Sequence, residues 1–196
     1  MIEELLITLA EFAIGFGTSA VTGYLLATLM FIWDDIERIL YPYIIVYRTI
    51  PVIALLPICI IWFGFGLVSI TVVSFLISFF PMVVNTLAGY KSTDDELIGM
   101  MKSFSASRKD LYLNLFRYSS LPMVFSGLKI AVVLAFTGAI VGEFLIGQRG
   151  IGYMALYYNN NFETEKMFAA IFTATIAQLS IFGAVAALER YYVDWT

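Results

Sequence analysis

Five long apolar runs determine what this chain can fold into. They cover residues 5–31, 39–63, 67–87, 123–146 and 167–188. A helix rises about 1.5 Å per residue, so about 20 apolar residues cross a hydrocarbon core of roughly 30 Å. Each run reaches that length. The runs therefore predict an all-α membrane protein with five transmembrane helices, which we treat as a single domain over residues 1–196.

The composition also indicates a membrane protein, and it excludes several classes of function. Hydrophobic residues make up 61% of the 196 residues and charged residues 13%, whereas soluble domains average about a quarter charged. The net charge of -4 and the lack of a basic run give no reason to expect nucleic acid as a partner. The sequence has no histidine, which excludes Ser-His and Cys-His catalysis. Cys59, within an apolar run, is expected to be a packing residue.

Small residues recur every four positions in the first and fourth runs. This spacing lets two helix backbones approach closely in lipid, where apolar burial does not drive association. We therefore expect both runs to pack tightly against other helices. The residues are Gly15, Ser19, Gly23 and Ala27 in the first run, and Gly127, Ala131, Ala135 and Ala139 in the fourth.

Prolines interrupt the second run at positions 42, 51 and 57. A proline within a helix removes a backbone hydrogen bond and clashes with the preceding turn, so this span is expected to be kinked or locally unwound. Irregular backbone at membrane depth is tolerated against protein or a water-filled path. Arg48, just before Pro51, either faces such a path or extends toward the nearer membrane surface.

Two carboxylates lie in the apolar runs. Glu143, near the end of the fourth run, either lines a pathway or gate or bonds to another helix, because a charge in hydrocarbon needs water or a partner. Glu11 is either a gate or a helix-end group that reaches the interface. The sequence shows no clustered carboxylate pair within the spans, which together with the lack of histidine makes an intramembrane enzyme the weakest hypothesis.

The segment from Ser92 to Pro122 is a polar interruption between apolar runs. Its pattern predicts a helix, a turn and a second short helix. Thr93 with Glu96 is expected to form a capping box at the first helix, and Ser107 with Asp110 at the second. The apolar residues share one side, which is expected to anchor the segment on the bundle through Leu97, Met101 and Phe104, with Leu111 and Leu115 on the same side. The alternative is an amphipathic helix that lies on lipid.

The distribution of lysine and arginine predicts the orientation. If the spans alternate, nine of these residues lie on or nearer the side that holds the 92–122 segment, and only Arg149 and Lys166 lie on the other side. The positive-inside rule then makes the 92–122 segment and the C-terminus cytoplasmic and places the N-terminus outside.

Several motifs resemble the permeases of type I ABC importers. Ala106-Ser-Arg108 and Leu121-Pro122 resemble the cytoplasmic loop of that family, although Gly99, Ser105 and Tyr118 depart from its pattern. The flanking spans resemble the nitrate, sulfonate, taurine and thiamine-precursor branch more strongly. The motifs there are Tyr41-Pro42, Thr49-Ile-Pro51, Trp62-Phe-Gly-Phe-Gly66, Phe79-Phe-Pro81 with Asn85-Thr86, Ser126-Gly-Leu-Lys129, Val141-Gly-Glu143 and Gly150-Ile-Gly-Tyr153. That branch commonly has an additional helix before the first one here, so the resemblance covers its five-helix core.

The resemblance implies a non-catalytic subunit of a prokaryotic inner-membrane importer. Its expected partners are ABC ATPase subunits, a second permease copy or a homologous permease, an extracytoplasmic solute-binding protein and membrane lipids. ATP and Mg²⁺ would bind to the ATPase, with no cofactor in this chain, which lacks the GxxxxGK[ST] phosphate-binding motif. The solute would be a sulfonate, nitrate, a pyrimidine or thiamine precursor, or a similar small molecule.

The resemblance also supplies candidate site residues. The coupling segment that docks on the ATPase would consist of Ser103, Phe104, Ser105, Ala106, Ser107, Arg108, Lys109 and Asp110. Candidate residues of the translocation pathway or gate are Arg48, Pro51, Asn85 and Glu143. Ser105 stands where the family has a glycine and would have to adopt a positive φ, which costs a residue with a side chain more than it costs glycine. The alternative function is a secondary transporter or channel that works without an ATPase and uses Glu143, Arg48 or Glu11 as ion sites.

Overall fold

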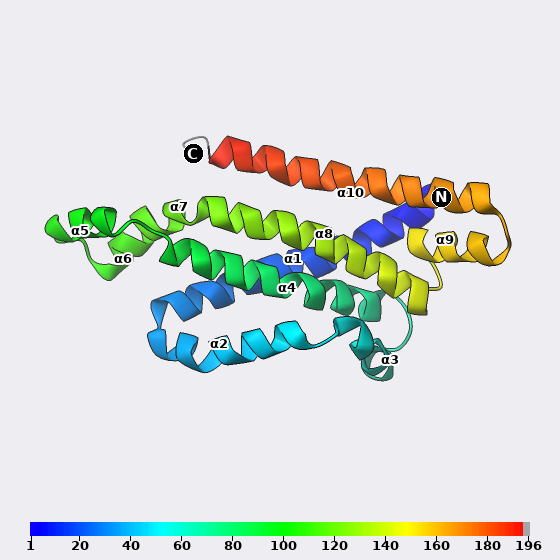
Figure 1. The fold of residues 1–196 in the computed structure, drawn as a ribbon, viewed down its shortest axis with the longest axis horizontal. Helices are drawn as coiled ribbons and strands as arrows, with labels where there is room; N and C mark the ends of the chain where they lie inside the picture. The colour runs from blue at the N-terminus through cyan, green and yellow to red at the C-terminus, as the bar shows by residue number, and fades with distance from the viewer. Residues whose placement is uncertain (194–196) are drawn as a thin grey trace.

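A computed structural model describes residues 1–193, which form helices joined by short connections, with no β-strand (Figure 1). The long helices are α1 (Ile2–Ile32), α4 (Leu67–Lys91), α8 (Leu121–Ile146) and α10 (Thr164–Tyr192). The shorter elements are α2 (Asp34–Thr49), a 3₁₀ turn (Val52–Leu55), α3 (Leu56–Phe63), α5 (Asp95–Ser103), α6 (Arg108–Leu111), a π-helical turn (Tyr112–Phe116), α7 (Arg117–Ser119) and α9 (Ile151–Asn160).

Four helices, α1, α4, α8 and α10, are long and apolar enough to cross a membrane. Together, α2 and the segment from Val52 to Phe63 meet the same criterion as a fifth, bent span. The predicted all-α membrane fold is therefore confirmed. Between α8 and α10, outside the five apolar runs, the chain forms the additional helix α9.

Helix α4 is the centre of the bundle and packs along both α8 and α1, which also contact each other (Figure 1). The predicted rows of small residues lie at these two contacts and are buried. A Cβ atom added at Gly15 would lie 2.6 Å from the hydroxyl oxygen of Ser74, and one at Gly23 would lie 2.9 Å from Cβ of Met82. Glycine at these positions is therefore what lets α1 approach α4.

The second span is broken, as its prolines predict. Helix α2 ends at Thr49, and its axis makes an angle of 89° with the next helical segment, which begins at Val52. Pro51 stands at the break, where its lack of an N–H group costs no helical hydrogen bond. Pro57 lies in the first turn of α3, and Pro42 lies inside α2 without ending it. The hydroxyl of Tyr47 donates a 2.5 Å hydrogen bond to the carbonyl of Leu76, which ties the end of α2 to α4.

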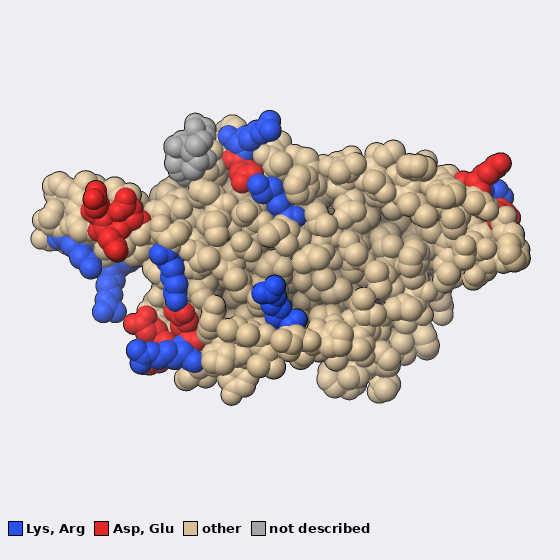
Figure 2. All heavy atoms as spheres, in the orientation of Figure 1, with Lys and Arg blue, Asp and Glu red and all other residues tan. Residues whose placement is uncertain are grey.

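Charged side chains gather toward the two ends of the long axis, with a few more near the middle of this face, and the remaining surface is uncharged (Figure 2). One end carries α5 and α6, and we call it the α5–α6 end; the other carries α9 and is called the α9 end (Figure 1). Helix α10 lies along the outside of the bundle, and none of its most apolar 18-residue window is buried. An apolar surface of this kind suits contact with lipid or with another membrane helix.

Candidate functional site

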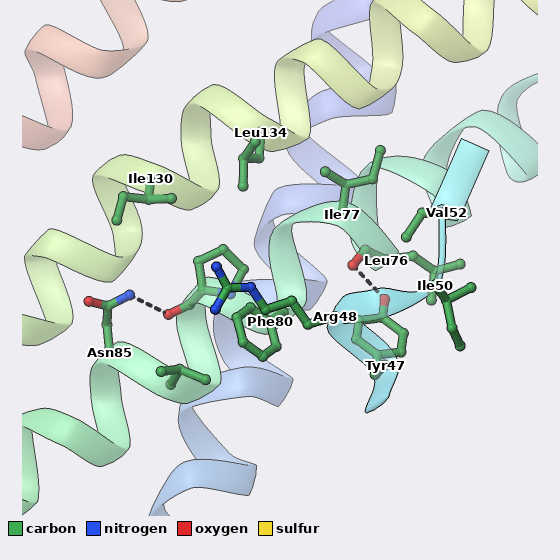
Figure 3. Close-up of a pocket in the computed structure, with 12 residues that line it drawn as sticks. Tyr47, Arg48, Ile50, Val52, Leu76, Ile77, Phe80, Asn85, Ile130 and Leu134 are labelled. Atoms are coloured by element: carbon green, nitrogen blue, oxygen red, sulfur yellow. Dashed lines mark hydrogen bonds between the residues drawn. The ribbon is translucent and has the colours of Figure 1, made fainter. Parts of the chain in front are cut away.

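A pocket of about 440 Å³ lies beside α4, between the end of α2 and the middle of α8 (Figure 3). Twelve residues line it, and most of them are aliphatic or aromatic. Its polar side chains are Tyr47, Arg48 and Asn85. Two of the four candidate pathway residues, Arg48 and Asn85, are therefore brought together from helices that are distant in the sequence. Pro51 is exposed and lies between two lining residues, Ile50 and Val52.

The guanidinium of Arg48 lies over an aromatic ring, with Cζ 5.4 Å from the ring centroid of Phe80. This is the geometry of a cation–π contact, which orients the charged group. No ion pair within residues 1–193 involves Arg48. Arg48 is also the only charged side chain among those that line the pocket. The pocket thus has a fixed positive charge on an otherwise uncharged wall.

Asn85 is half-buried on α4 and faces α8. Its Nδ2 donates a 2.8 Å hydrogen bond to the carbonyl oxygen of Pro81, one helical turn earlier (Figure 3). A carbonyl oxygen can only accept, so this bond fixes the amide orientation and leaves Oδ1 as an acceptor and the second N–H of Nδ2 as a donor. Glycine at position 127 makes room for this side chain, since a Cβ there would lie 2.9 Å from Cβ of Asn85.

Glu143 lies apart from this pocket, at the α9 end. It is completely buried and joins three helices. Its Oε1 accepts a 2.5 Å hydrogen bond from the hydroxyl of Thr8 in α1, and its Oε2 accepts a 2.6 Å bond from the N–H of Gly152 in α9. The Thr8 oxygen in turn accepts from the N–H of Ile151 at 2.9 Å. Nothing larger than glycine fits at position 150, because a Cβ there would overlap the Glu143 carboxyl group.

The first amides of α9 are thus capped by side chains from other helices. Glu4 accepts a 2.6 Å bond from the N–H of Gly150 and lies 3.4 Å from Arg149. A helix begins with N–H groups that have no partner within the helix, and a carboxylate there satisfies them. These bonds connect α1, α8 and α9 into one unit, which we call the α9 cap. Of the two roles open to Glu143 from the sequence, this geometry favours bonding between helices.

Two carboxylates do lie together within the spans, so the prediction that no such pair exists is wrong. Glu11, which is 2% exposed, contacts the Glu143 carboxyl group, and no residue within 1–193 bonds to its Oε2. Glu11 therefore does not reach the interface as a helix-end group. The two residues are 132 positions apart, and their contact depends on how α1 packs on α8, which no local pattern encodes. No group of three or more potential metal ligands occurs among the described residues.

The 92–122 segment forms the expected helix, turn and short helix. The capping box predicted at Thr93 and Glu96 is wrong. Asp94 caps α5 instead, because its Oδ1 accepts a 2.8 Å bond from the N–H of Glu96, while Thr93 is buried. Aspartate and threonine both cap helices well, so the choice between these adjacent residues depends on where the helix begins.

The second capping box, between Ser107 and Asp110, is confirmed. The serine hydroxyl accepts a 3.2 Å bond from the N–H of Asp110, whose carboxylate accepts a 3.0 Å bond from the N–H of Ser107. Hydrogen bonds from the Ser107 side chain and backbone lower the pKa of Asp110. Ser105 has a φ of 57°, the positive value expected where the family has glycine.

The predicted anchor of this segment is only partly correct. Leu111 is 7% exposed, but Leu97 is 41% and Phe104 is 78% exposed, so the latter two do not hold the segment on the bundle. Aromatic contacts hold it instead. The rings of Phe31 and Phe116 lie 4.7 Å apart, and the hydroxyls of Tyr90 and Tyr112 lie 3.3 Å apart. The four-residue spacing of Tyr112 and Phe116 was the sequence signal for this anchor.

These features define a helical membrane protein with an exposed helical segment at one end and a pocket beside its central helix. The family of binding-protein-dependent transport system inner membrane components matches residues 13–193, and the chain belongs to that family. A chain of the methionine ABC transporter MetNI in inward-facing conformations shares the fold, with a TM-score of 0.85 at 16% identity over 98% of this chain and 95% of that one.

Comparison with curated relatives indicates the branch of this family to which the chain is similar. The chain is 40% identical to the formylaminopyrimidine transport permease ThiX of Halalkalibacterium halodurans, over 96% of this chain and 75% of the relative. It is 36% identical to the riboflavin transport system permease RibX of Chloroflexus aurantiacus, over 82% and 60% respectively. It is 32% identical to the nitrate import permease NrtB of Synechococcus elongatus, over 95% and 68%. This chain is therefore an inner-membrane permease of an ABC importer for a small solute, in the branch that its motifs resemble.

Proposed function

We propose that this permease forms the translocation path for a sulfonate, nitrate, a pyrimidine or thiamine precursor, or a similar small solute, and that its 103–110 segment docks on the ATPase. In this proposal an extracytoplasmic binding protein delivers the solute, and a second permease copy or a homologous permease completes the path. ATP and Mg²⁺ bind to the separate ATPase subunits. The 92–122 segment and the C-terminus face the cytoplasm, and the N-terminus faces outside. The permease class favours an ATP-driven importer over a secondary transporter or channel.

The docking role is supported by a difference in exposure between the base and the tip of the segment. Its base is anchored by Leu111 and by the contact between Phe31 and Phe116, while its tip exposes Phe104. Large exposed apolar side chains among polar ones are typical of protein interfaces. The exposed tip also carries Ser105, Ser107, Arg108, Lys109 and Asp110, all of which are exposed. A rigid base with an apolar tip can transmit movement between a bound subunit and the bundle.

The test is to replace Phe104 with aspartate in the complete transporter. Because Phe104 is 78% exposed, Phe104→Asp leaves the fold intact, and we expect the permease to reach the membrane in normal amounts but to lose the ATPase on purification. Phe162 supplies a matched control, since it is 93% exposed and lies between α9 and α10, at the other end of the bundle. Phe162→Asp should keep the ATPase. Normal ATPase recovery with Phe104→Asp would contradict the proposal.

A further inference from the structure

Glu11 and Glu143 form a buried carboxyl pair at the α9 end, away from the pocket beside α4. We propose that the pair is a proton-binding site, in which Glu11 is a neutral carboxylic acid that donates a hydrogen bond to an ionised Glu143. The bound proton holds α9 against α1 and α8. This role is separate from ATPase docking and from the identity of the solute.

The contact between the two side chains requires a proton. Glu11 is 2% exposed and Glu143 is 0% exposed, and a hydrogen bond joins their carboxyl groups. An ionised carboxylate has acceptor oxygens and no donor, so such a bond exists only when one of the two groups carries a proton. Two ionised carboxylates in contact away from water would also repel each other strongly. The pair therefore carries a single negative charge.

The donors around the pair decide which carboxyl group carries the proton. Glu143 accepts hydrogen bonds from the hydroxyl of Thr8 and from the backbone N–H groups of Gly152 and Tyr153. Such bonds stabilise the ionised form of a carboxyl group. Glu11 lacks this support, because its Oε2 has no partner within residues 1–193. The proton therefore belongs on Glu11, whose O–H group donates to Glu143.

No positive charge among the described residues offsets the pair. None of the ion pairs within residues 1–193 involves Glu11 or Glu143. The other ionisable side chains of the surrounding elements are exposed or make their contacts elsewhere: Arg149 with Glu3 and Glu4, Tyr24 with Tyr90, Lys91 with Glu37, Lys129 with Glu189, Tyr157 with Tyr153 and Tyr158, Lys166 with Glu163, and the exposed Glu165. A bound proton is thus what reduces the cost of burying two acids together.

This arrangement links the proton to the packing of α9. Glu143 caps the first N–H groups of α9, and Glu11 belongs to α1. When α9 detaches, water reaches the pair, and Glu11 releases its proton as an isolated glutamate does at neutral pH. The open form therefore binds fewer protons than the closed form. By linkage, opening of α9 becomes easier as the pH rises.

The test is hydrogen exchange over residues 151–160 in the complete transporter in lipid nanodiscs, corrected for intrinsic rates. Between about pH 7 and about pH 9, exchange in the unmodified protein should become faster by up to about ten-fold per pH unit. Glu11→Gln has an amide N–H donor that no change of pH removes, so its corrected exchange should not depend on pH. Glu3→Gln is the matched control: the Glu3 side chain is 87% exposed on the same helix, and this variant should keep the profile of the unmodified protein.

A flat profile in the unmodified protein would overturn the proposal whether or not the variants fold, and so would a pH dependence that persists in Glu11→Gln. Faster exchange when N-methylglucamine chloride replaces sodium and potassium chloride would show that a cation, not a proton, neutralises the pair. Infrared difference spectra of the unmodified protein and Glu11→Gln supply a readout that is independent of stability. They should contain the C=O stretching band of a protonated carboxyl group at about pH 7, where an isolated glutamate is ionised. Absence of that band would contradict the assignment of the proton to Glu11.

Discussion

The two ends of the bundle use polar residues in opposite ways. At the α9 end, Glu143 is buried and bonds to Thr8 and Gly152, which belong to two other helices. At the α5–α6 end, Ser107 and Asp110 are exposed and bond to each other within one turn. Polar bonds between distant elements fix how helices pack, whereas bonds within one turn fix only local shape. The α9 end is therefore held together by bonds between helices of this chain, whereas the α5–α6 end exposes side chains that no other helix covers.

The largest expected effect is that of Glu143→Ala, which tests whether the buried polar bonds at the α9 end stabilise the packing of the helices. The change leaves the buried N–H of Gly152 without its acceptor, and it removes the shorter of the two acceptors of the Thr8 hydroxyl, which keeps a 3.2 Å bond to the carbonyl of Glu4. An unsatisfied buried group costs about 1–3 kcal/mol, so we expect a loss of that order in the free energy of unfolding, measured by thermal unfolding of the detergent-solubilised permease.

Two variants serve as controls for Glu143→Ala. Glu143→Gln keeps one acceptor oxygen and should lose less stability. Glu189→Ala removes a carboxylate that is partly exposed in its ion pair with Lys129, so it should change stability by less than about 1 kcal/mol. If Glu143→Ala unfolds at the temperature of the unmodified permease, the α9 cap does not hold the helices together.

A smaller effect is expected at the α5–α6 end from Ser105→Gly. A residue other than glycine at a φ of 57° is strained by about 1–2 kcal/mol. Glycine removes this strain, but part of the gain is offset because glycine loses more conformational freedom on folding. The net gain should be about 0.5 kcal/mol, measured as slower hydrogen exchange over residues 95–111. Ser103→Gly, in the last turn of α5, is the control and should speed exchange, since glycine is unfavourable in a helix. Faster exchange in Ser105→Gly would show that the turn is unstrained.

The smallest effect concerns pH. Hydrogen bonds from Ser107 lower the pKa of Asp110 below its usual 3.8, so the folded segment favours the ionised form. The stability that this adds is fully present above pH 3.8 and is lost as the pH falls through the lowered pKa. After correction for intrinsic rates, hydrogen exchange over residues 107–111 should become faster on acidification in the unmodified chain. Asp110→Asn should remove that dependence. An identical pH profile in the unmodified chain and in Asp110→Asn would contradict this role of Asp110.

Local patterns predicted much of this molecule. The apolar runs, the rows of small residues, the break near Pro51 and the capping box at Ser107 each depend on residues close in sequence, and each is present. Packing between distant helices was not predictable in this way. The contact of Glu11 with Glu143 and the aromatic anchor of the 92–122 segment depend on which faces meet. Leu97 and Phe104 were assigned to the bundle because a periodic apolar face does not reveal which partner covers it.

The break in the second span also has a consequence for how this region crosses the membrane. Helix α2 has 16 residues and α3 has 8, so they are about 24 and 12 Å long, and neither alone crosses roughly 30 Å of hydrocarbon. This crossing therefore depends on the two segments together, and the bond from Tyr47 to Leu76 holds the break between them against α4.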